Sequence, residues 1–230
     1  MRIQYISDLH LTNQIPKIVT NAEVIAILGD VGDPFDRIYS EFLYRMSNQF
    51  KLVLLVAGNH EFYTHTIPKT IAQLRKVVSH FHNVVFLNNE AIIYEGVVFA
   101  GTTLWSNILD EDAHGINDFK KIRNFGVEDF RELHYESVNF IKDILQRPFE
   151  QVVILTHHAP HRAFNGNYTT HLSAFSTDLN QFIQDPVKAW LCGHTHVNLE
   201  ITVNWVKLGS NCLGYSFEKT FFDPGKYIEI

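Results

Sequence analysis

We expect the chain to fold as an α/β domain, and two patterns support this expectation. Short apolar runs recur along its 230 residues, and many of them alternate with stretches of helical spacing. Hydrophobic residues make up 46% of the sequence and charged residues 19%, so the chain can bury a sizeable core. At this length, and without an internal repeat, linker or low-complexity segment, we expect one domain over residues 1–230.

The first half of the chain is predicted to contain parallel βαβ units, because strands and helices alternate there. Three short apolar runs are expected to be strands: residues 3–6, 24–28 and 52–56. Helical spacing predicts helices over residues 36–48 and 67–79 and a helix beginning within 17–20.

The rest of the chain is predicted to be more antiparallel. Three closely spaced runs separated by turn residues predict a meander: residues 84–87, 91–94 and 97–101. Later strands are expected at residues 152–155, 189–191, 199–208 (a hairpin) and 227–230. Helices are expected over residues 127–145 and 176–184, and irregular loops over 104–125 and 160–176.

Composition narrows the classes of function. A net charge of −6 argues against a broad nucleic-acid surface, which needs an excess of Lys and Arg. Two cysteines, Cys192 and Cys212, do not form a disulfide framework and are expected to be buried thiols in a reducing compartment. No apolar stretch approaches the roughly 18 residues that a membrane helix requires, so we expect a soluble, cytoplasmic protein.

Polar motifs follow five of the apolar runs and hold nearly all of the side chains that suit a metal ion. They are Asp8-Leu9-His10, Gly29-Asp30, Gly58-Asn59-His60-Glu61, His157-His158 and Gly193-His194-Thr195-His196. Strands that end in such polar turns bring their side chains to one edge of a sheet. Each motif alone is a common turn or cap, but the five together predict a cluster that binds two divalent cations.

The residue types in these motifs match that chemistry. The Asp-x-His spacing places both side chains on one face of an extended strand. The two oxygens of Asp30 can bridge two cations, and the amide oxygen of Asn59 can bind one without adding charge. His194 and His196 lie in one turn, and each can bind a different metal ion. Mixed nitrogen and oxygen ligands favour Mn, Fe, Zn, Co or Ni over Ca or Mg.

The five motifs resemble the signature of the calcineurin-like metallophosphoesterases, which runs D-x-H, G-D-x-x-D, G-N-H-[DE], a strand-end His and G-H-x-H. The second motif stands here as Gly29-Asp30-Val31-Gly32-Asp33, and every ligand position of the signature is filled. The resemblance extends from residue 3 to the C-terminus. It implies a four-layer α/β/β/α sandwich with two central mixed sheets.

The resemblance also implies a role for each residue. His60 would protonate the leaving oxygen while a hydroxide between the metals attacks phosphorus in line. The implied metal ligands are Asp8, His10 and His196 for one ion, Asn59, His157 and His194 for the other, and Asp30 as the bridge. The position of Pro160 favours His158 as the ligand, but the strand-end rule favours His157, and we predict His157.

Further residues are candidates for supporting roles. Asp33 and Glu61 are expected to orient histidine ligands. The loops at 104–125 and 161–176 are expected to supply substrate contacts, because loops on a rigid scaffold often carry specificity. Candidates for contact with a phosphate or a base are Arg123, Arg162 and His171.

Together these features predict a metal-dependent phosphatase or phosphodiesterase that acts on a small phosphomonoester or phosphodiester. A nuclease acting on DNA or RNA is a second hypothesis, and it would require a basic groove that the composition does not indicate. A non-catalytic interaction module on the same fold is a third. Such a module would be expected to lose metal ligands or His60, yet all of them are present. The oligomeric state is not predictable from the sequence.

Overall fold

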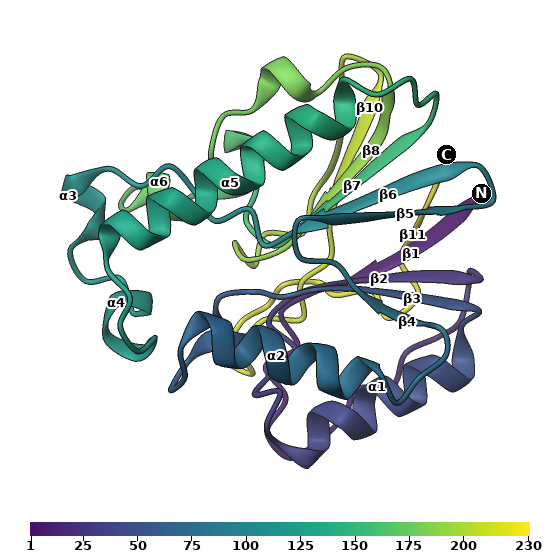
Figure 1. The fold of residues 1–230 in the computed structure, drawn as a ribbon, viewed down its shortest axis with the longest axis horizontal. Helices are drawn as coiled ribbons and strands as arrows, with labels where there is room; N and C mark the ends of the chain where they lie inside the picture. Colours follow the sequence, from purple (N-terminus) through teal and green to yellow (C-terminus); the bar gives the residue numbers. More distant parts are fainter.

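Two β-sheets pack face to face in the computed structural model, which describes residues 1–230, and helices cover the outer face of each sheet (Figure 1). The first sheet has the order β11 (Tyr227–Glu229), β1 (Arg2–Ile6), β2 (Val24–Leu28), β3 (Leu52–Val56), β4 (Val84–Phe86). The second has the order β5 (Glu90–Tyr94), β6 (Val97–Thr102), β7 (Val152–Thr156), β8 (Val187–Cys192), β10 (Val206–Ser210), β9 (Glu200–Val203).

The helices complete a four-layer α/β/β/α arrangement, which confirms the predicted fold class. Figure 1 shows α1 (Arg37–Gln49) and α2 (Ile67–Val78) below the first sheet and α5 (Val127–Leu145) above the second. Three short helices lie in the loops: α3 (Asp110–Ala113), α4 (Asp118–Lys121) and α6 (Leu172–Phe175). Both sheets are mixed, because β11 pairs antiparallel at one edge of the first sheet and β5 and β9 do so at the edges of the second.

The parallel βαβ units of the first half are confirmed, but the predicted meander is wrong. Strand β4 pairs parallel with β3, because α2 carries the chain across the first sheet. Only β5 and β6 form a hairpin, and it lies in the second sheet. The three runs at 84–101 therefore divide between the two sheets. Apolar spacing predicts a strand but does not identify its partner.

Two predicted helices are also wrong, and both predicted loops are more regular than expected, since the loop at 160–176 contains a 3-10 helix at Arg162–Asn165 and α6. Residues 17–20 have no helical structure; they belong to an irregular connection fixed by hydrogen bonds such as Gln4 Nε2 to the Val19 carbonyl, 2.8 Å. Within 176–184 only Asn180–Phe182 forms a 3-10 helix. The predicted loop at 104–125 contains α3 and α4, whose four residues each are too few for a clear apolar period.

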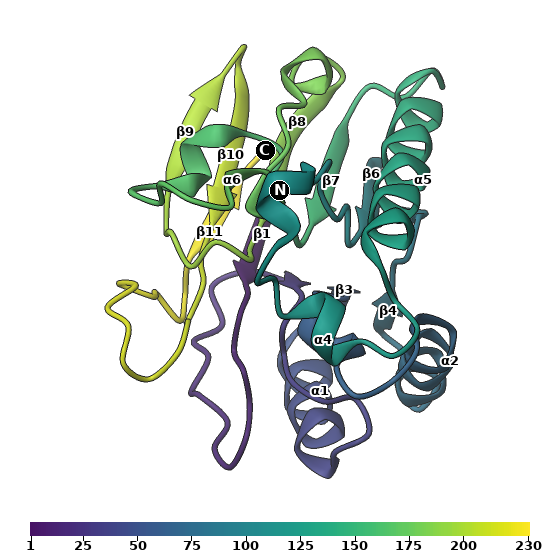
Figure 2. The ribbon, with the colours of Figure 1, turned by 90° about the vertical axis from the view of Figure 1, so that its left-hand side faces the viewer.

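The hydrophobic core has three parts that follow the layers. One lies between the sheets and includes Tyr5, Leu54, Phe99 and Leu191. The other two lie between each sheet and its covering helices. Figure 2, the view turned by 90°, shows α5 running along the outer face of the second sheet. No helix is both long enough and apolar enough to cross a lipid bilayer, and both cysteines are buried and unpaired.

We predict that the layer between the sheets dominates the stability of the fold. Phe99→Ala should lower the free energy of unfolding by about 3–5 kcal/mol, because it leaves a cavity at a fully buried site. Ile93→Ala, on the neighbouring strand but 65% exposed, should change it by less than about 0.5 kcal/mol. Urea unfolding of both variants tests this prediction, and equal losses would contradict it.

Candidate metal centre

The five polar motifs lie at the carboxyl ends of five strands, β1, β2 and β3 in one sheet and β7 and β8 in the other. Neighbouring strands in each group run parallel, so their carboxyl ends meet at one edge. The chain turns sharply there, and several of these residues adopt a positive φ that non-glycine residues rarely adopt. They are Asp8 at 56°, His10 at 44°, Asp30 at 54°, His194 at 70° and His196 at 54°.

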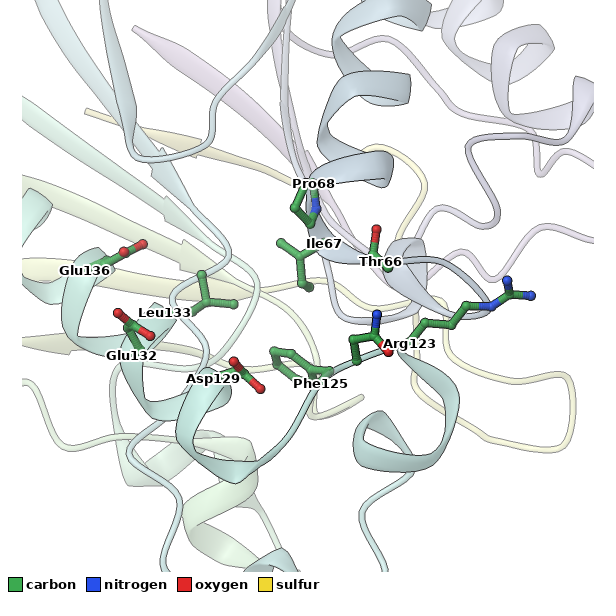
Figure 3. Close-up of a pocket in the computed structure, with 10 residues that line it drawn as sticks. Thr66, Ile67, Pro68, Arg123, Phe125, Asp129, Glu132, Leu133 and Glu136 are labelled. Carbon is green, nitrogen blue, oxygen red and sulfur yellow. The ribbon is translucent and has the colours of Figure 1, made fainter.

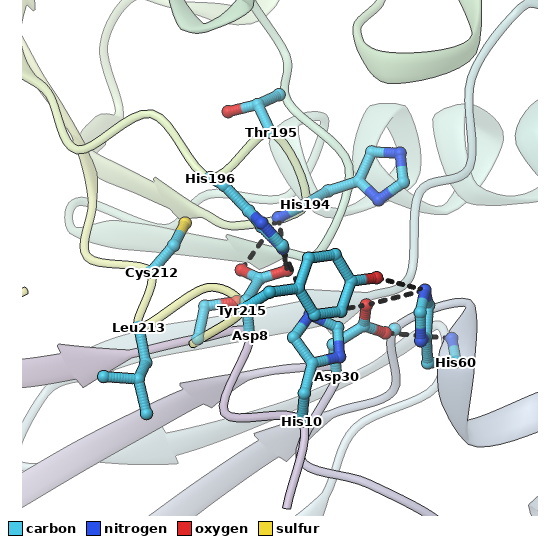
Figure 4. Close-up of polar contacts among 12 residues, drawn as sticks. Asp8, His10, Asp30, His60, His194, Thr195, His196, Cys212, Leu213 and Tyr215 are labelled. Carbon is cyan, nitrogen blue, oxygen red and sulfur yellow. Dashed lines mark hydrogen bonds and ion pairs between the residues drawn. The ribbon is translucent and has the colours of Figure 1, made fainter. Parts of the chain in front are cut away.

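One group of side chains consists of Asp8, His10 and His196. Nε2 of His196 lies 3.3 Å from Oδ1 of Asp8 and 3.1 Å from Nε2 of His10. Figure 4 shows His196 beside the Asp8 carboxylate, and ligand atoms of all three residues lie within 4.8 Å of one another. These three residues come from opposite ends of the sequence, and they are the set that the resemblance assigned to one metal.

A second group lies on the other side of Asp30. Nε2 of His157 is 3.0 Å from Oδ1 of Asn59 and 3.5 Å from Oδ1 of Asp30. Ligand nitrogens of His157, His158 and His194 lie within 4.8 Å of one another. Since Oδ2 of Asp30 also lies 3.9 Å from Nε2 of His10, this carboxylate stands between the two groups.

The adjacent histidines His157 and His158 have different surroundings. Nδ1 of His157 donates to the Leu28 carbonyl, 2.7 Å away, which leaves Nε2 directed at Asn59. His158 stacks on His194 with 3.9 Å between ring centroids, and neither of its ring nitrogens has a hydrogen-bond partner. The Leu28 carbonyl holds the imidazole ring of His157 in one orientation. Metal-binding histidines are commonly held in this way, by a hydrogen bond from the ring nitrogen that does not bind the metal. This arrangement favours His157 as the ligand.

His60 lies beside the cluster rather than within either group. Its backbone N–H donates to Oδ1 of Asp30 at 2.9 Å, and its Nε2 lies 3.8 Å from Oδ2 of the same carboxylate. Its ring packs 4.3 Å from that of Tyr63, centroid to centroid, and its Nε2 is 3.4 Å from the hydroxyl of Tyr215. This position leaves Nε2 facing the cavity above Asp30.

Carboxylates around the cluster hold the candidate ligands in place. Oε2 of Glu218 lies 2.6 Å from Nδ1 of His196. Oδ1 of Asp118 accepts hydrogen bonds from Nδ2 of Asn59 and from the Tyr63 hydroxyl, both at 2.8 Å. The bond from Asn59 fixes which way its amide points, so that Oδ1 faces His157.

Glu61 and Asp33 do not act as expected. The fully buried Glu61 carboxylate accepts hydrogen bonds from the backbone N–H groups of Asp30, Val31 and Gly58, so it holds two turns together and contacts no histidine. Asp33 accepts from the backbone N–H of Phe35, a local turn. Sequence reasoning did not find Asp118 or Glu218 as supports, because neither is close in sequence to the ligand that it contacts.

The two arginine candidates lie outside the cavity at the metal centre. Arg123 borders a separate hollow between the start of α2 and α5, with Phe125 and acidic side chains of α5 (Figure 3). Arg162 lines a groove with Glu111 and Thr169. His171, in contrast, lines the cavity at the centre. Both arginines lie in the loops that were expected to contact substrate, but neither a position in a loop nor a positive charge indicates where the side chain points.

Burial and close packing shift the pKa values of the cluster. Burial lowers the pKa of His10 to about 4 and that of His60 to about 3, so both imidazoles are neutral at pH 7. Burial and neighbouring carboxylates raise the pKa of Asp30. Burial also favours the neutral form of His196, but hydrogen bonds to two carboxylates raise its pKa to about 9.

The donor set fits divalent cations. Four overlapping groups of histidine and aspartate place ligand atoms within 4.8 Å of one another. Neutral imidazoles, carboxylates and one amide oxygen are the mixed ligands that transition metals and zinc prefer. The backbone at Gly58 also passes close to the Asp30 carboxylate. A Cβ atom at this position would collide with Oδ1 of Asp30, so only glycine fits.

Known proteins resemble the chain in sequence and in fold. The family model described as calcineurin-like phosphoesterase matches residues 1–198, and the chain therefore belongs to this family. Uncharacterized protein L509 of Acanthamoeba polyphaga mimivirus is 33% identical over 272 residues, covering 100% of this chain and 97% of that protein. The crystal structure of phosphopantetheinyl hydrolase (PptH) from Mycobacterium tuberculosis has a similar fold, with a TM-score of 0.70 and 16% identity over 93% of this chain and 89% of that one.

We predict that Asp118 controls the orientation of Asn59. Asp118→Ala removes the acceptor of the amide N–H, so the affinity for Mn²⁺ should fall about 10–100-fold. It should also lower the free energy of unfolding by about 1–3 kcal/mol, because two buried donors lose their partner. Asp110→Ala, an exposed aspartate in the same segment, is the matched control and should bind Mn²⁺ normally. Titration calorimetry measures both affinities, and unchanged binding in Asp118→Ala would contradict the assigned role.

Proposed function

We propose that the protein is a binuclear metal-dependent hydrolase of small phosphoesters. The observation that carries this proposal is the position of Asp30, whose two carboxylate oxygens face His10 on one side and His157 on the other. Membership in the calcineurin-like phosphoesterase family supports the same reaction class. The candidate sites are Asp8, His10 and His196 for one cation and Asn59, His157 and His194 for the other, with Asp30 shared between them.

Two divalent cations bound there would lower the pKa of a water between them and neutralise charge on the phosphate oxygens. The protein side chains then have separate tasks. Asp118 and Glu218 hold Asn59 and His196 in binding orientation. Nε2 of His60 lies 3.8 Å from Oδ2 of Asp30, and from there it would give a proton to the leaving oxygen of a phosphoester bound at the metals.

The low pKa of His60 refines its proposed role as the general acid. An unperturbed histidine titrates near pH 6.5, but burial lowers the pKa of His60 to about 3, so it needs a nearby negative charge to hold a proton. The substrate phosphate would supply that charge.

The walls of the cavity favour a small substrate over a nucleic acid. Its 16 lining residues include no Lys or Arg, so it offers no basic track for a phosphate backbone. A non-catalytic module is disfavoured because the candidate ligands and His60 are all present, and five of them, Asp30, Asn59, His60, His194 and His196, line one cavity.

The proposal predicts hydrolysis of bis-p-nitrophenyl phosphate or p-nitrophenyl phosphate that depends on added metal. Activity should appear with Mn²⁺ and disappear with a chelator, because activation of the attacking water requires the cations that the donor set would bind. Release of p-nitrophenolate measures the rate. Bound metal with no turnover of either ester would instead favour a binding module.

We also predict a leaving-group dependence for His60→Asn. The variant should keep its metals and lose about 10²–10⁴-fold in rate on esters with poor leaving groups, but much less on p-nitrophenyl esters, which leave without a proton. His80→Asn, on a histidine outside the cavity, is the control and should match the wild-type protein. A uniform loss across leaving groups would contradict proton donation by His60.

A further inference from the structure

Two aromatic stacks extend outward from the metal centre, one from each group of candidate ligands. On one side Tyr215 stacks on His10, with centroids 4.4 Å apart and planes at 21°, and Phe217 stacks on Tyr215 at 5.5 Å and 20°. Phe217 is 81% exposed. This stack therefore begins at a candidate ligand and ends in a ring that faces solvent.

The second stack begins at His194. Phe175 lies 5.4 Å from His194 between ring centroids, and Tyr168 stacks on Phe175 at 5.2 Å with planes at 13°. Tyr168 and Phe175 both line the cavity, and Tyr168 is 44% exposed. The cavity of about 310 Å³ is therefore lined by rings of both stacks, Tyr215 from the first and Tyr168 and Phe175 from the second.

The cavity is lined by carboxylates and by no basic side chain other than histidine. Asp30, Asp118 and Glu218 line it, and no Lys or Arg does. Lys121 lies outside, with Nζ 4.9 Å from the centre of the Tyr63 ring. Sites that hold a dianionic phosphate group usually add Arg or Lys to the metals, and this cavity lacks them. A phosphodiester, with one negative charge, fits these walls better than a monoester.

We propose that the substrate is a monoanionic phosphodiester with a flat aromatic ring on an ester arm, a specificity that rests on the proposed phosphoesterase function. A diester has two arms, and the cavity has two stacks. The leaving arm passes beside Nε2 of His60 and the hydroxyl of Tyr215, which are 3.4 Å apart, toward Phe217. The other arm packs against Tyr168 and Phe175.

Binding measurements test this proposal separately from catalysis. Titration calorimetry on the Mn²⁺-loaded protein would compare diphenyl phosphate, diethyl phosphate and phenyl phosphate. Diphenyl phosphate should bind about tenfold more tightly than diethyl phosphate, because base-like rings gain that much from stacking on aromatic side chains. It should also bind more tightly than dianionic phenyl phosphate at pH 8.

Variants with matched controls locate the stacking sites. Phe217→Ala and Tyr168→Ala should each weaken diphenyl phosphate about tenfold and leave diethyl phosphate unchanged. Phe221→Ala, 91% exposed and near Phe217 in sequence, and Tyr135→Ala, 55% exposed on α5, should change neither affinity.

The binding results and the hydrolysis results test the substrate specificity and the catalytic function separately. Equal binding of diphenyl and diethyl phosphate, or tighter binding of phenyl phosphate, would overturn the diester assignment even if the protein hydrolyses phosphoesters. Selective binding of diphenyl phosphate without hydrolysis of any ester would support the stacking sites and overturn the proposed catalytic function.

Discussion

The buried carboxylate of Asp30 is the constraint on which the rest of the centre depends. It sits at the end of a central strand, and its oxygens face imidazoles that come from both sheets. Burial of a carboxylate is costly unless it is paired, and the backbone N–H of His60 offsets only part of that cost. Divalent cations would stabilise Asp30 and the surrounding donors together, so the same ions would stabilise the buried cluster and supply the proposed chemistry.

The two sheets explain how distant motifs reach this carboxylate. Strands β1 to β3 bring the first three motifs to one edge, and β7 and β8 bring the last two to the facing edge. The apolar layer between the sheets sets their separation. Left-handed turns at Asp8, Asp30 and His194 then direct the side chains inward. A positive φ at a non-glycine residue is strained, and it persists only where the surrounding structure holds the residue in place.

Much of this arrangement was predictable from the sequence. An apolar run indicates a strand, and the polar motif that follows it marks the end of that strand. The βαβ units and the convergence of Asp8, Asp30 and His157 followed from those two signals. Asp118 and Glu218 were not predictable, since each reaches its partner through a loop whose path no local pattern defines. The partner of β4 and the direction of Arg123 were missed for the same reason: both depend on tertiary packing.

One buried carboxylate and two groups of donors thus define a site at which a pair of cations would share Asp30. Anomalous diffraction from crystals soaked in Mn²⁺ tests it most directly. We expect two peaks roughly 3.5–4 Å apart, one beside Asp8, His10 and His196 and one beside Asn59, His157 and His194. A single peak, or two peaks without Asp30 between them, would contradict the account.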